Sequence, residues 1–299
     1  MPAAAVASFR IRRLRDAEAI RARLRREPAY AAYALGQLAP RLFPLVSCWE
    51  ADGPDGAGLT LFSRGGLGDA VFVMGAPSAI AAILTLHQGP RHNFATLRPE
   101  HLPAFERVFR LTSRQPMMRM VVDRRTFRPA PTPASFGVTV RRLTAADTRA
   151  LNRLYNTEGQ PTYYSAGHVE QGMYHGVWEG RQLVAVAGTH VISPEEGVAV
   201  VGNVFTHPER RSVGYGGAAT GATTGALLDR CAEVALTVDP TNTPAVRAYL
   251  RLGYREDVRL LEAAVVRRSL TATGAALAAR LAAWRGRGDG EEVIRRSFA

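Results

Sequence analysis

The sequence predicts an α/β (α+β) fold made of two similar units, each a mixed sheet with helices on both faces. Three observations predict it. A Pro-rich segment at residues 128–135 divides the chain, and each side of it opens with a strand followed by a capped helix. In both halves strands then alternate with helices in the same order, as in a mixed sheet whose parallel neighbours are joined by helical crossovers.

The length and the cysteine content limit the class of protein. The 299 residues are many for one domain and sufficient for two. Cys48 and Cys231 are isolated, without metal-ligand spacing or a disulfide framework, so we expect no metal site and a cytoplasmic location. No apolar run is long enough to cross a bilayer, and residues 1–6 lack the basic start of a signal peptide, so we expect no membrane association.

The net charge of +12 comes entirely from Arg, because the sequence contains no Lys. Residues 1–135 carry +9 of this charge. We interpret the Arg excess first as composition bias, and second as a surface that steers an anionic partner. The Arg residues between 10 and 26 alternate with acidic and apolar residues, which is typical of solvated faces, so we expect no nucleic-acid partner.

The first strand and helix cap of each half define the proposed repeat. The first half has Phe9–Leu14 followed by Asp16 as an N-cap, and the second has Val138–Leu143 followed by Thr144 with Asp147 three residues later. We therefore predict four segments: a first domain at 1–128, a linker at 129–135, a second domain at 136–270 and a helical tail at 271–299. The apolar stripe of the tail requires a partner surface, either on its own domain or in a homodimer.

The remaining elements follow from turns and apolar periodicity. In the second half we expect a hairpin (173–179 and 182–192), strands at 198–206, 233–239 and 254–268, and helices at 214–230 and 243–252. In the first half we expect strands at 59–63, 70–74, 93–97 and 117–122, and helices at 77–88 and 99–109.

The run from Asn203 to Gly217 carries the clearest chemical signal. A strand ends in a turn that contains Pro208, and Arg211, Gly214 and Gly216 then form an Arg-x-x-Gly-x-Gly pattern before a helix of small residues. Glycine allows close approach and positive φ, and a helix N-terminus attracts anions, so the pattern predicts a diphosphate site. At the same place the first half has a single Gly75 followed by Pro77, so we expect no phosphate site there.

A dinucleotide-binding fingerprint is an alternative interpretation. Gly214–Ala219 satisfies G-x-G-x-x-A, and Asp239 ends the next expected strand. Against it, Pro208 and several polar residues separate the strand from the first Gly, and too few βαβ units follow. A purely structural glycine turn before a tightly packed helix is the other alternative.

A second motif follows the strand that ends at Asp239. Residues 242–254 read Asn-x-x-Ala-x-x-x-Tyr-x-x-x-Gly-Tyr, with Asn242 or Thr243 capping a helix that Gly253 ends. Together with Arg-x-x-Gly-x-Gly, this run resembles the GCN5-related N-acetyltransferase (GNAT) superfamily. The motifs cover about residues 138–268, and the half they occupy is similar to glycine N-acyltransferase-like proteins, in which a variant half precedes an active one.

The resemblance implies a tandem of two GNAT-like domains with mixed, mostly antiparallel sheets, the first a degenerate copy. It also implies a donor site for acetyl-CoA, and Tyr249 as the acid that protonates the leaving thiolate. Cofactor binding would fall to residues of the strand, the glycine turn and the second motif: Val204, Phe205, Thr206, Arg211, Ser212, Val213, Gly214, Tyr215, Gly216 and Asn242.

The sequence leaves the general base and the acceptor open. Residues 198–206 contain no acid or His, so the candidates are Glu158, Glu170, His175 and His190, or an ordered water. Tyr155, Tyr163, Tyr164 and His168 are candidates for the acceptor site, and packing explains them equally well. We therefore expect an N-acetyltransferase acting on a primary amine of a small molecule or peptide. The alternative is an acyl-CoA-binding pseudoenzyme whose basic first half contacts an anionic partner.

Overall fold

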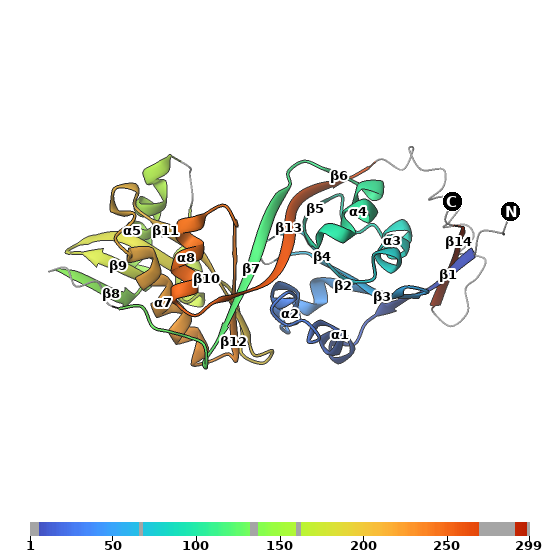
Figure 1. Ribbon diagram of the computed structural model, residues 1–299, viewed down its shortest axis with the longest axis horizontal. Coiled ribbons are helices and arrows are strands. Elements are labelled where there is room, and N and C mark those ends of the chain that lie inside the picture. Colours follow the sequence, from blue (N-terminus) through green and yellow to red (C-terminus); the bar gives the residue numbers. More distant parts are fainter. Residues whose placement is uncertain (1–5, 66–67, 132–136, 160–162, 269–290, 298–299) are drawn as a thin grey trace. The chain divides into compact units, whose positions relative to one another are not determined.

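The structure is a computed structural model that describes residues 6–65, 68–131, 137–159, 163–268 and 291–297. The chain forms two compact units, and each unit combines segments that are distant in the sequence (Figure 1). Unit 1 contains residues 1–26, 37–116 and 259–299, and unit 2 contains residues 27–36 and 117–258. The repeat boundaries expected at 128 and 136 stay a prediction, because these units are defined by contacts in space.

Unit 1 is an α/β unit whose strands run in the order β14-β1-β2-β3-β4-β5-β13. All neighbours in it are antiparallel except β4 and β5, which are parallel and are joined by α3 (Pro77–Leu86). Helices α1 (Ala17–Leu24) and α4 (Leu102–Val108) complete the unit. The strands are β1 (Val6–Leu14), β2 (Val46–Gly53), β3 (Gly56–Ser63), β4 (Ala70–Gly75), β5 (His92–Leu97), β13 (Arg255–Arg267), β14 (Glu291–Ser297) and the short β6 (Phe109–Leu111), which pairs with β13.

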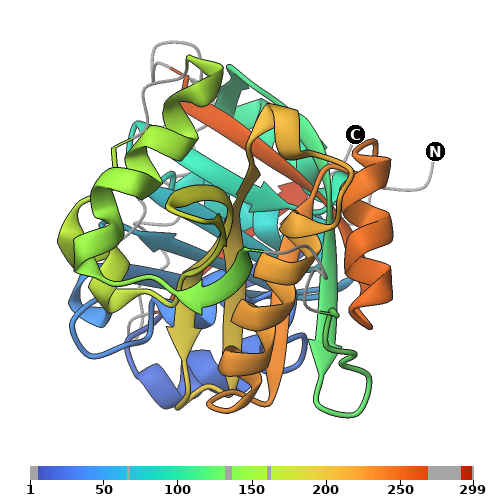
Figure 2. The ribbon, with the colours of Figure 1, turned by 90° about the vertical axis from the view of Figure 1, so that its left-hand side faces the viewer.

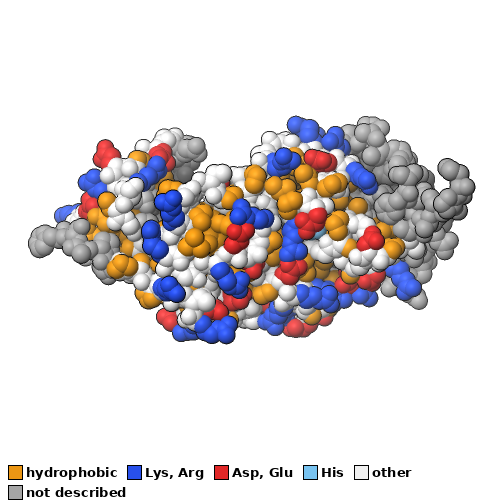
Figure 3. Space-filling view, viewed as in Figure 1, with side chains coloured by type: hydrophobic (Ala, Val, Ile, Leu, Met, Phe, Trp, Pro, Cys, Tyr) orange, Lys and Arg blue, Asp and Glu red, His pale blue; other side chains and the backbone are white. Residues whose placement is uncertain are grey.

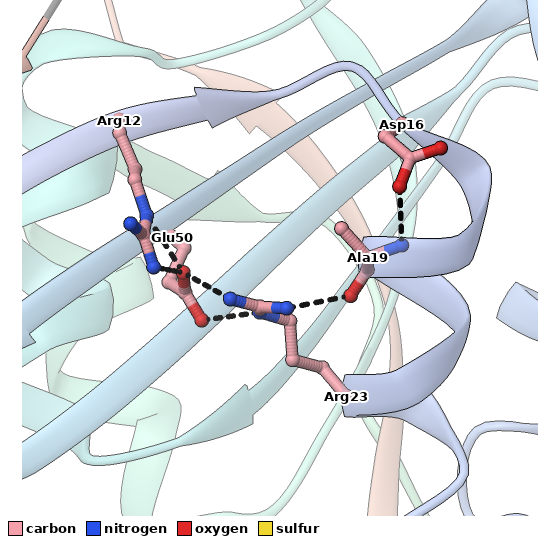
Figure 4. Close-up of polar contacts among 5 residues, drawn as sticks. All are labelled: Arg12, Asp16, Ala19, Arg23 and Glu50. Carbon is pink, nitrogen blue, oxygen red and sulfur yellow. Dashed lines mark hydrogen bonds and ion pairs between the residues drawn. The ribbon is translucent and has the colours of Figure 1, made fainter.

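A buried carboxylate ties the first strand and helix of unit 1 together (Figure 4). Glu50 on β2 accepts hydrogen bonds from Arg12 on β1, at 2.6 and 2.9 Å, and from Arg23 on α1, at 2.5 and 2.9 Å. Burial alone would raise the pKa of Glu50, but the two guanidinium groups lower it below its usual value. The predicted N-cap Asp16 is confirmed, because its carboxylate accepts the Ala19 N–H at 2.9 Å.

Unit 2 repeats the same plan with the strand order β7-β12-β11-β10-β9-β8. Again one pair is parallel, β11 with β12, and a helix, α7 (Tyr215–Leu228), joins the two strands. The other helices are α2 (Ala32–Gly36), α5 (Thr148–Tyr155), α6 (Ala166–Gln171) and α8 (Thr243–Arg251). The strands are β7 (Gln115–Asp123), β8 (Val138–Arg142), β9 (His175–Glu179), β10 (Gln182–Ser193), β11 (Val198–Thr206) and β12 (Glu233–Val238).

Helices cover both faces of the unit 2 sheet, as predicted. On one face Ala218 and Ala219 of α7 pack against Val177 and Ala187 of the sheet, and α8 lies beside α7 (Figure 2). On the other face Leu151 of α5 and a residue of α6, Val169, contribute to a second apolar cluster. The small residues of α7 are what let a helix lie this close to the strands.

The mostly antiparallel sheet confirms the predicted fold class and contradicts the dinucleotide-binding alternative, which requires a parallel doubly wound sheet. Asp239, the acid that alternative needed, instead accepts hydrogen bonds from the N–H and hydroxyl of Thr241 at 2.8 and 2.7 Å.

Two features of the chain differ from the expected pattern. Residues 118–123 of β7 pair with β12 in unit 2, and residues 261–266 of β13 pair with β5 in unit 1. Each half therefore supplies its last long strand to the sheet of the other unit. In the expected helical tail, Glu291–Ser297 is instead a strand paired with β1 at the edge of the sheet; residues 271–284 lie outside the described part.

Candidate functional site

The glycine turn forms the N-terminus of α7. Ser212 has φ 67° and the N-cap Gly214 has φ 92°, so the backbone twice enters the left-handed region that favours glycine. The Ala218 N–H gives the helix its first backbone bond, to the Gly214 carbonyl at 3.0 Å. The N–H groups of Gly216 and Gly217 precede that bond, and such groups are the natural partners of an anion.

Gly216 is required by close packing rather than by its dihedral angles. A Cβ at this position would lie 2.9 Å from the Thr206 hydroxyl at the end of β11. At Gly214 a Cβ would meet nothing within 4 Å, so the positive φ alone explains that glycine. The two positions of the motif thus require glycine for different reasons, close packing at Gly216 and a positive φ at Gly214.

Strand β11 separates from β12 just before this turn. The two strands pair only from Val198–Val201 to Glu233–Leu236, so residues 202–206 leave their β12 side without a strand partner in the described chain. On its other side β11 carries a bulge, since Asn203 and Val204 together oppose Ala187 of β10. Asn203 has φ 54° at this bulge. The result is a free backbone edge next to the N-terminus of α7.

Helix α8 borders the same space. Asn242 caps it by accepting the Ala245 N–H at 3.3 Å, which leaves the amide N–H groups of the side chain as the donors a ligand would meet. Tyr249, two turns further, is 7% exposed, and burial raises its pKa to about 12. Its ring lies 6.1 Å from that of Tyr254, whose hydroxyl is hydrogen-bonded to Thr224 at 2.8 Å.

These elements enclose a cavity of about 810 Å³ in unit 2. The structure places ten of the eleven predicted site residues in its wall: Val204, Phe205, Thr206, Arg211, Ser212, Gly214, Tyr215, Gly216, Asn242 and Tyr249. The eleventh, Val213, does not line the cavity and is 58% exposed. The roles of all eleven stay predictions.

The cavity wall is rich in guanidinium groups. Arg210, Arg211, Arg247 and Arg251 line it, and Glu158 is the acid that accompanies them. Arg211 forms an ion pair with Glu158 at 2.5 Å, and its guanidinium lies 6.0 Å from the Phe205 ring centre. Arg210 forms an ion pair with Glu179 at 2.8 Å. The Glu179 carboxylate also accepts a hydrogen bond from the Tyr215 hydroxyl at 2.7 Å.

The four side chains considered as a general base lie in different surroundings. Glu158 lines the cavity but is engaged by Arg211. His175 on β9 contacts the Thr223 hydroxyl at 3.2 Å, and burial together with the Arg142 charge lowers its pKa to about 4. His190 is hydrogen-bonded on both ring nitrogens, and Glu170 is exposed on α6. None of the last three lines the cavity.

Beyond Phe205 lies an aromatic cluster. Tyr155 stacks on Tyr164 at 4.9 Å between ring centres, lies 5.4 Å from Phe205, and donates a hydrogen bond to the Asn203 carbonyl. Of the other acceptor-site candidates, Tyr163 is 84% exposed, and His168 belongs to the capping box at the start of α6. The structure thus brings together two of the four.

Sequence reasoning did not single out Arg247 and Arg251, which stand four residues apart on α8 and therefore share a face. The i, i+4 spacing was the available signal. It also missed the Tyr33–His190 contact, because no local pattern connects residues 157 positions apart.

In the first half, the turn before α3, the helix that corresponds to α7, is built differently from the glycine turn. The carbonyl of Gly75 lies 2.9 Å from Nε2 of the buried His101, and a Cβ on Gly75 would lie 2.3 Å from the Ala57 carbonyl oxygen. Gly75 therefore serves the packing of β4 on β3, and Pro77 occupies the first turn of α3.

Residues 140–254 match the model of the Acetyltransferase (GNAT) family. Among solved structures, the chain is similar to a GCN5-related N-acetyltransferase from Sphaerobacter thermophilus, with TM-score 0.56 and 18% identity over 87% of this chain and 96% of that one. It is also similar to a Drosophila protein, with TM-score 0.55 and 15% identity over 83% and 88%.

A third similar structure is described as a GCN5-related glucosamine N-acetyltransferase region of a fungal multi-domain GH3 β-N-acetylglucosaminidase. Its TM-score is 0.50 at 14% identity, over 86% of this chain and 38% of that one. At these identities the similarity concerns the fold. No curated protein sequence matched the chain.

Two further observations concern the described residues alone. Helices in this part of the chain are too short or too polar to cross a membrane. The same residues bring no three His, Cys, Asp or Glu side chains together in a metal-binding group.

Proposed function

We propose that unit 2 is an acyl-CoA-dependent N-acyltransferase that transfers acetyl from acetyl-CoA directly to a primary amine. The observation that carries this proposal is the cavity, whose wall contains the α7 N-terminus, the free edge of β11 and the buried Tyr249. The GNAT-family match over residues 140–254 supports acyl transfer from an acyl-CoA to an amine.

Coenzyme A fits the charge of the cavity. The diphosphate would lie on the amides of Gly216 and Gly217, where backbone donors and the helix dipole favour an anion. Arg211 would approach the same group, while Arg247 and Arg251 on α8 supply further positive charge for a ligand with three phosphates. The pantetheine amides would pair with the free β11 edge at Val204–Thr206 and with Asn242.

The chemistry then needs two proton transfers. The amine nitrogen bonds to the thioester carbonyl carbon, the C–S bond breaks, and the nitrogen loses a proton. Tyr249 would donate to the sulfur, since a hydroxyl whose pKa is about 12 is protonated at neutral pH. Thiols titrate near ~8.5, so this hydroxyl stabilises the developing thiolate by hydrogen bonding and full proton transfer is assisted by solvent.

An ordered water is our proposal for removing the amine proton. Glu158, the carboxylate of the cavity wall, is paired with Arg211, and His175 and His190 have hydrogen-bond partners of their own. The acceptor would enter past Phe205 and the Tyr155–Tyr164 stack. Aromatic faces and phenolic hydroxyls suit a small amine or the end of a peptide.

Titration of the full chain with acetyl-CoA by calorimetry tests the donor. We expect saturable binding that Arg211→Glu weakens strongly, because the substitution puts a carboxylate beside the diphosphate. Arg124→Glu, on an exposed Arg paired with Asp229, is the matched control. Absence of binding by the unmodified protein would refute the proposal.

The alternative is a CoA-binding module without transferase activity, and the engaged state of Glu158, His175 and His190 favours it. Its basic first half would then contact an anionic partner. Acetyl transfer to any member of a panel of primary amines would show that the protein is an enzyme. Binding of acetyl-CoA without transfer, together with salt-sensitive binding of a polyanion, decides for the module.

The remaining proposals concern the cellular location, the domain arrangement, the branch of the family and the oligomeric state. The buried thiols of Cys48 and Cys231 are both unbridged, which supports a reducing, cytoplasmic location. The repeated β–α–β plan of the two units supports a tandem GNAT chain with a degenerate first half. Kinship with the glycine N-acyltransferase-like branch and a homodimer through the tail stay proposals from the sequence.

A further inference from the structure

A chain of hydrogen bonds converges on Asn203, the bulged residue of β11. Its side-chain oxygen lies 3.0 Å from Nε2 of His190, and its amide nitrogen donates to the Tyr174 hydroxyl at 3.1 Å. Its main-chain carbonyl accepts the Tyr155 hydroxyl. Asn203 is thus held on three sides at φ 54°, a conformation that an L-residue adopts only at a cost.

This series of hydrogen bonds continues to a residue from the first half of the sequence. The Tyr33 hydroxyl lies 2.6 Å from Nδ1 of His190. Tyr33 belongs to residues 27–36, the part of the first half that lies in unit 2. This segment is fixed there, because Arg119 stands 5.0 Å from the Tyr33 ring centre and donates to the Ala29 carbonyl at 3.2 Å.

The donors and acceptors of this chain are mutually consistent. Since Asn203 donates through its nitrogen to Tyr174, its oxygen is the atom that faces His190, and that oxygen only accepts. His190 therefore carries its proton on Nε2, and Nδ1 accepts the hydroxyl proton of Tyr33. Burial lowers the pKa of His190, the hydrogen bond to Asn203 opposes this effect, and the nearby Arg119 charge lowers the pKa further, so the net shift favours the neutral ring.

We propose that Tyr33 is a positioning residue for the acyl-CoA site, acting through His190 and Asn203 on the free edge of β11. Val204, the second residue of the bulge, and the following Phe205 and Thr206 line the cavity. Releasing Asn203 from its strained conformation would move this edge, while the α7 N-terminus would remain. The first half of the chain thereby contributes to the donor site of unit 2, which matters only if unit 2 binds acyl-CoA as proposed above.

Two ligands distinguish an effect on the β11 edge from an effect on the phosphate site. Coenzyme A engages both the β11 edge and the α7 N-terminus, whereas 3′-phospho-ADP lacks the pantetheine arm and engages only the latter. Calorimetry with Tyr33→Phe should show coenzyme A binding weakened about fivefold and 3′-phospho-ADP binding changed less than twofold. Asp147→Asn, which alters the capping of the unit 2 segment before α5, is the control and should change neither.

A double-mutant cycle tests the route through Asn203. Glycine accepts φ 54° without cost, so the effect of Tyr33→Phe should largely disappear in an Asn203→Gly background. The ¹⁵N NMR signals of the His190 ring should show a protonated Nε2 in the unmodified protein and a changed Nδ1 in Tyr33→Phe.

The outcomes distinguish the two proposals. If the unmodified protein binds neither ligand, the proposed function fails, and the positioning role falls with it. If it binds both and Tyr33→Phe weakens them equally or not at all, the positioning role alone is wrong. Independent effects of the two substitutions, or a proton on Nδ1 of His190, would also overturn it.

Discussion

The Arg211 guanidinium is bound to the Glu158 carboxylate at 2.5 Å in the wall of the unit 2 cavity. Both side chains are about half exposed, so the pair is weak and exchangeable. Under the proposed function, an incoming diphosphate would compete with Glu158 for the same guanidinium. The ion pair would therefore give way to the ligand, since an exposed pair contributes little to the stability of the fold.

Removing that carboxylate should strengthen coenzyme A binding. We expect Glu158→Gln to tighten the dissociation constant about two- to fivefold, the size of an exposed ion pair, with a smaller effect at high salt. Calorimetry at two salt concentrations measures this. Asp229→Asn removes an exposed acid paired with Arg124 outside the cavity and should leave the affinity unchanged. Weaker binding by Glu158→Gln would instead assign Glu158 a direct contact with the ligand.

The three glycines at the start of α7 should respond differently to alanine. Gly216→Ala brings a Cβ to 2.9 Å from the Thr206 hydroxyl and should reduce coenzyme A affinity, because the Thr206 side chain or the strand that carries it must shift. Gly214→Ala meets open space but keeps φ 92°, so we expect a loss of stability of about 1 to 2 kcal/mol. Chemical denaturation and calorimetry separate the two effects.

Gly217 provides the matched control for that series. A Cβ there would lie 3.9 Å from Ala248, an ordinary contact, and the position is helical. Gly217→Ala should therefore retain affinity and gain up to about 1 kcal/mol of stability. Equal losses of affinity at all three positions would contradict the different roles assigned to these glycines.

The sequence allowed the prediction of elements whose signals are local. The strand at 198–206, the cap at Asn242 and the helix ends at Gly214 and Gly253 all lie within a few residues of the pattern that predicts them. Ten of the residues that these motifs singled out line one cavity in the structure. Val213 does not line the cavity, because adjacency in the motif does not determine side-chain direction where Ser212 has φ 67°.

Long-range partners could not be predicted in this way. The apolar pattern of Gln115–Asp123 is equally compatible with either sheet, yet its residues 118–123 pair with β12. Tyr33 and His190 meet because residues 27–36 belong to unit 2, which no composition or spacing indicates. The net charge gave little guidance, since Arg side chains are spread over the visible face instead of forming one patch (Figure 3).

Tyr249→Phe should reduce turnover and spare binding. Loss of a proton donor costs about 10²-fold or more in rate, whereas the coenzyme A dissociation constant should change less than twofold because the ring is retained. An acid must be protonated to act, and burial raises the Tyr249 pKa to about 12. Its deprotonation therefore removes no activity between pH 7 and 10.

The pH profile checks that assignment with the best amine of a panel. Any alkaline limb below pH 10 should appear in both the unmodified protein and Tyr249→Phe, at a lower rate in the variant. A limb that vanishes with the substitution would mean that Tyr249 titrates in this range. Unchanged turnover would remove Tyr249 from the acid role.

His175 should make unit 2 sensitive to mild acid. Burial, aided by the Arg142 charge, lowers its pKa to about 4 from an ordinary value near ~6.5. Between these values the unfolded chain binds a proton that the folded chain excludes, so stability falls as pH drops from 6.5 toward 4 and changes no further below. The shift corresponds to about 3 kcal/mol.

Two substitutions test this origin of the acid sensitivity. His175→Gln keeps a polar group near Thr223 but cannot titrate, so it should flatten the fall in the free energy of unfolding between pH 6.5 and 4. Arg142→Gln removes the neighbouring charge, which should raise the His175 pKa and flatten the fall only in part. Urea denaturation at a series of pH values measures both. If His175→Gln leaves the slope intact, the acid sensitivity between pH 6.5 and 4 belongs to other groups; the carboxylate of Asp147, whose pKa is lowered to about 2 chiefly by Arg141, acts only below this range.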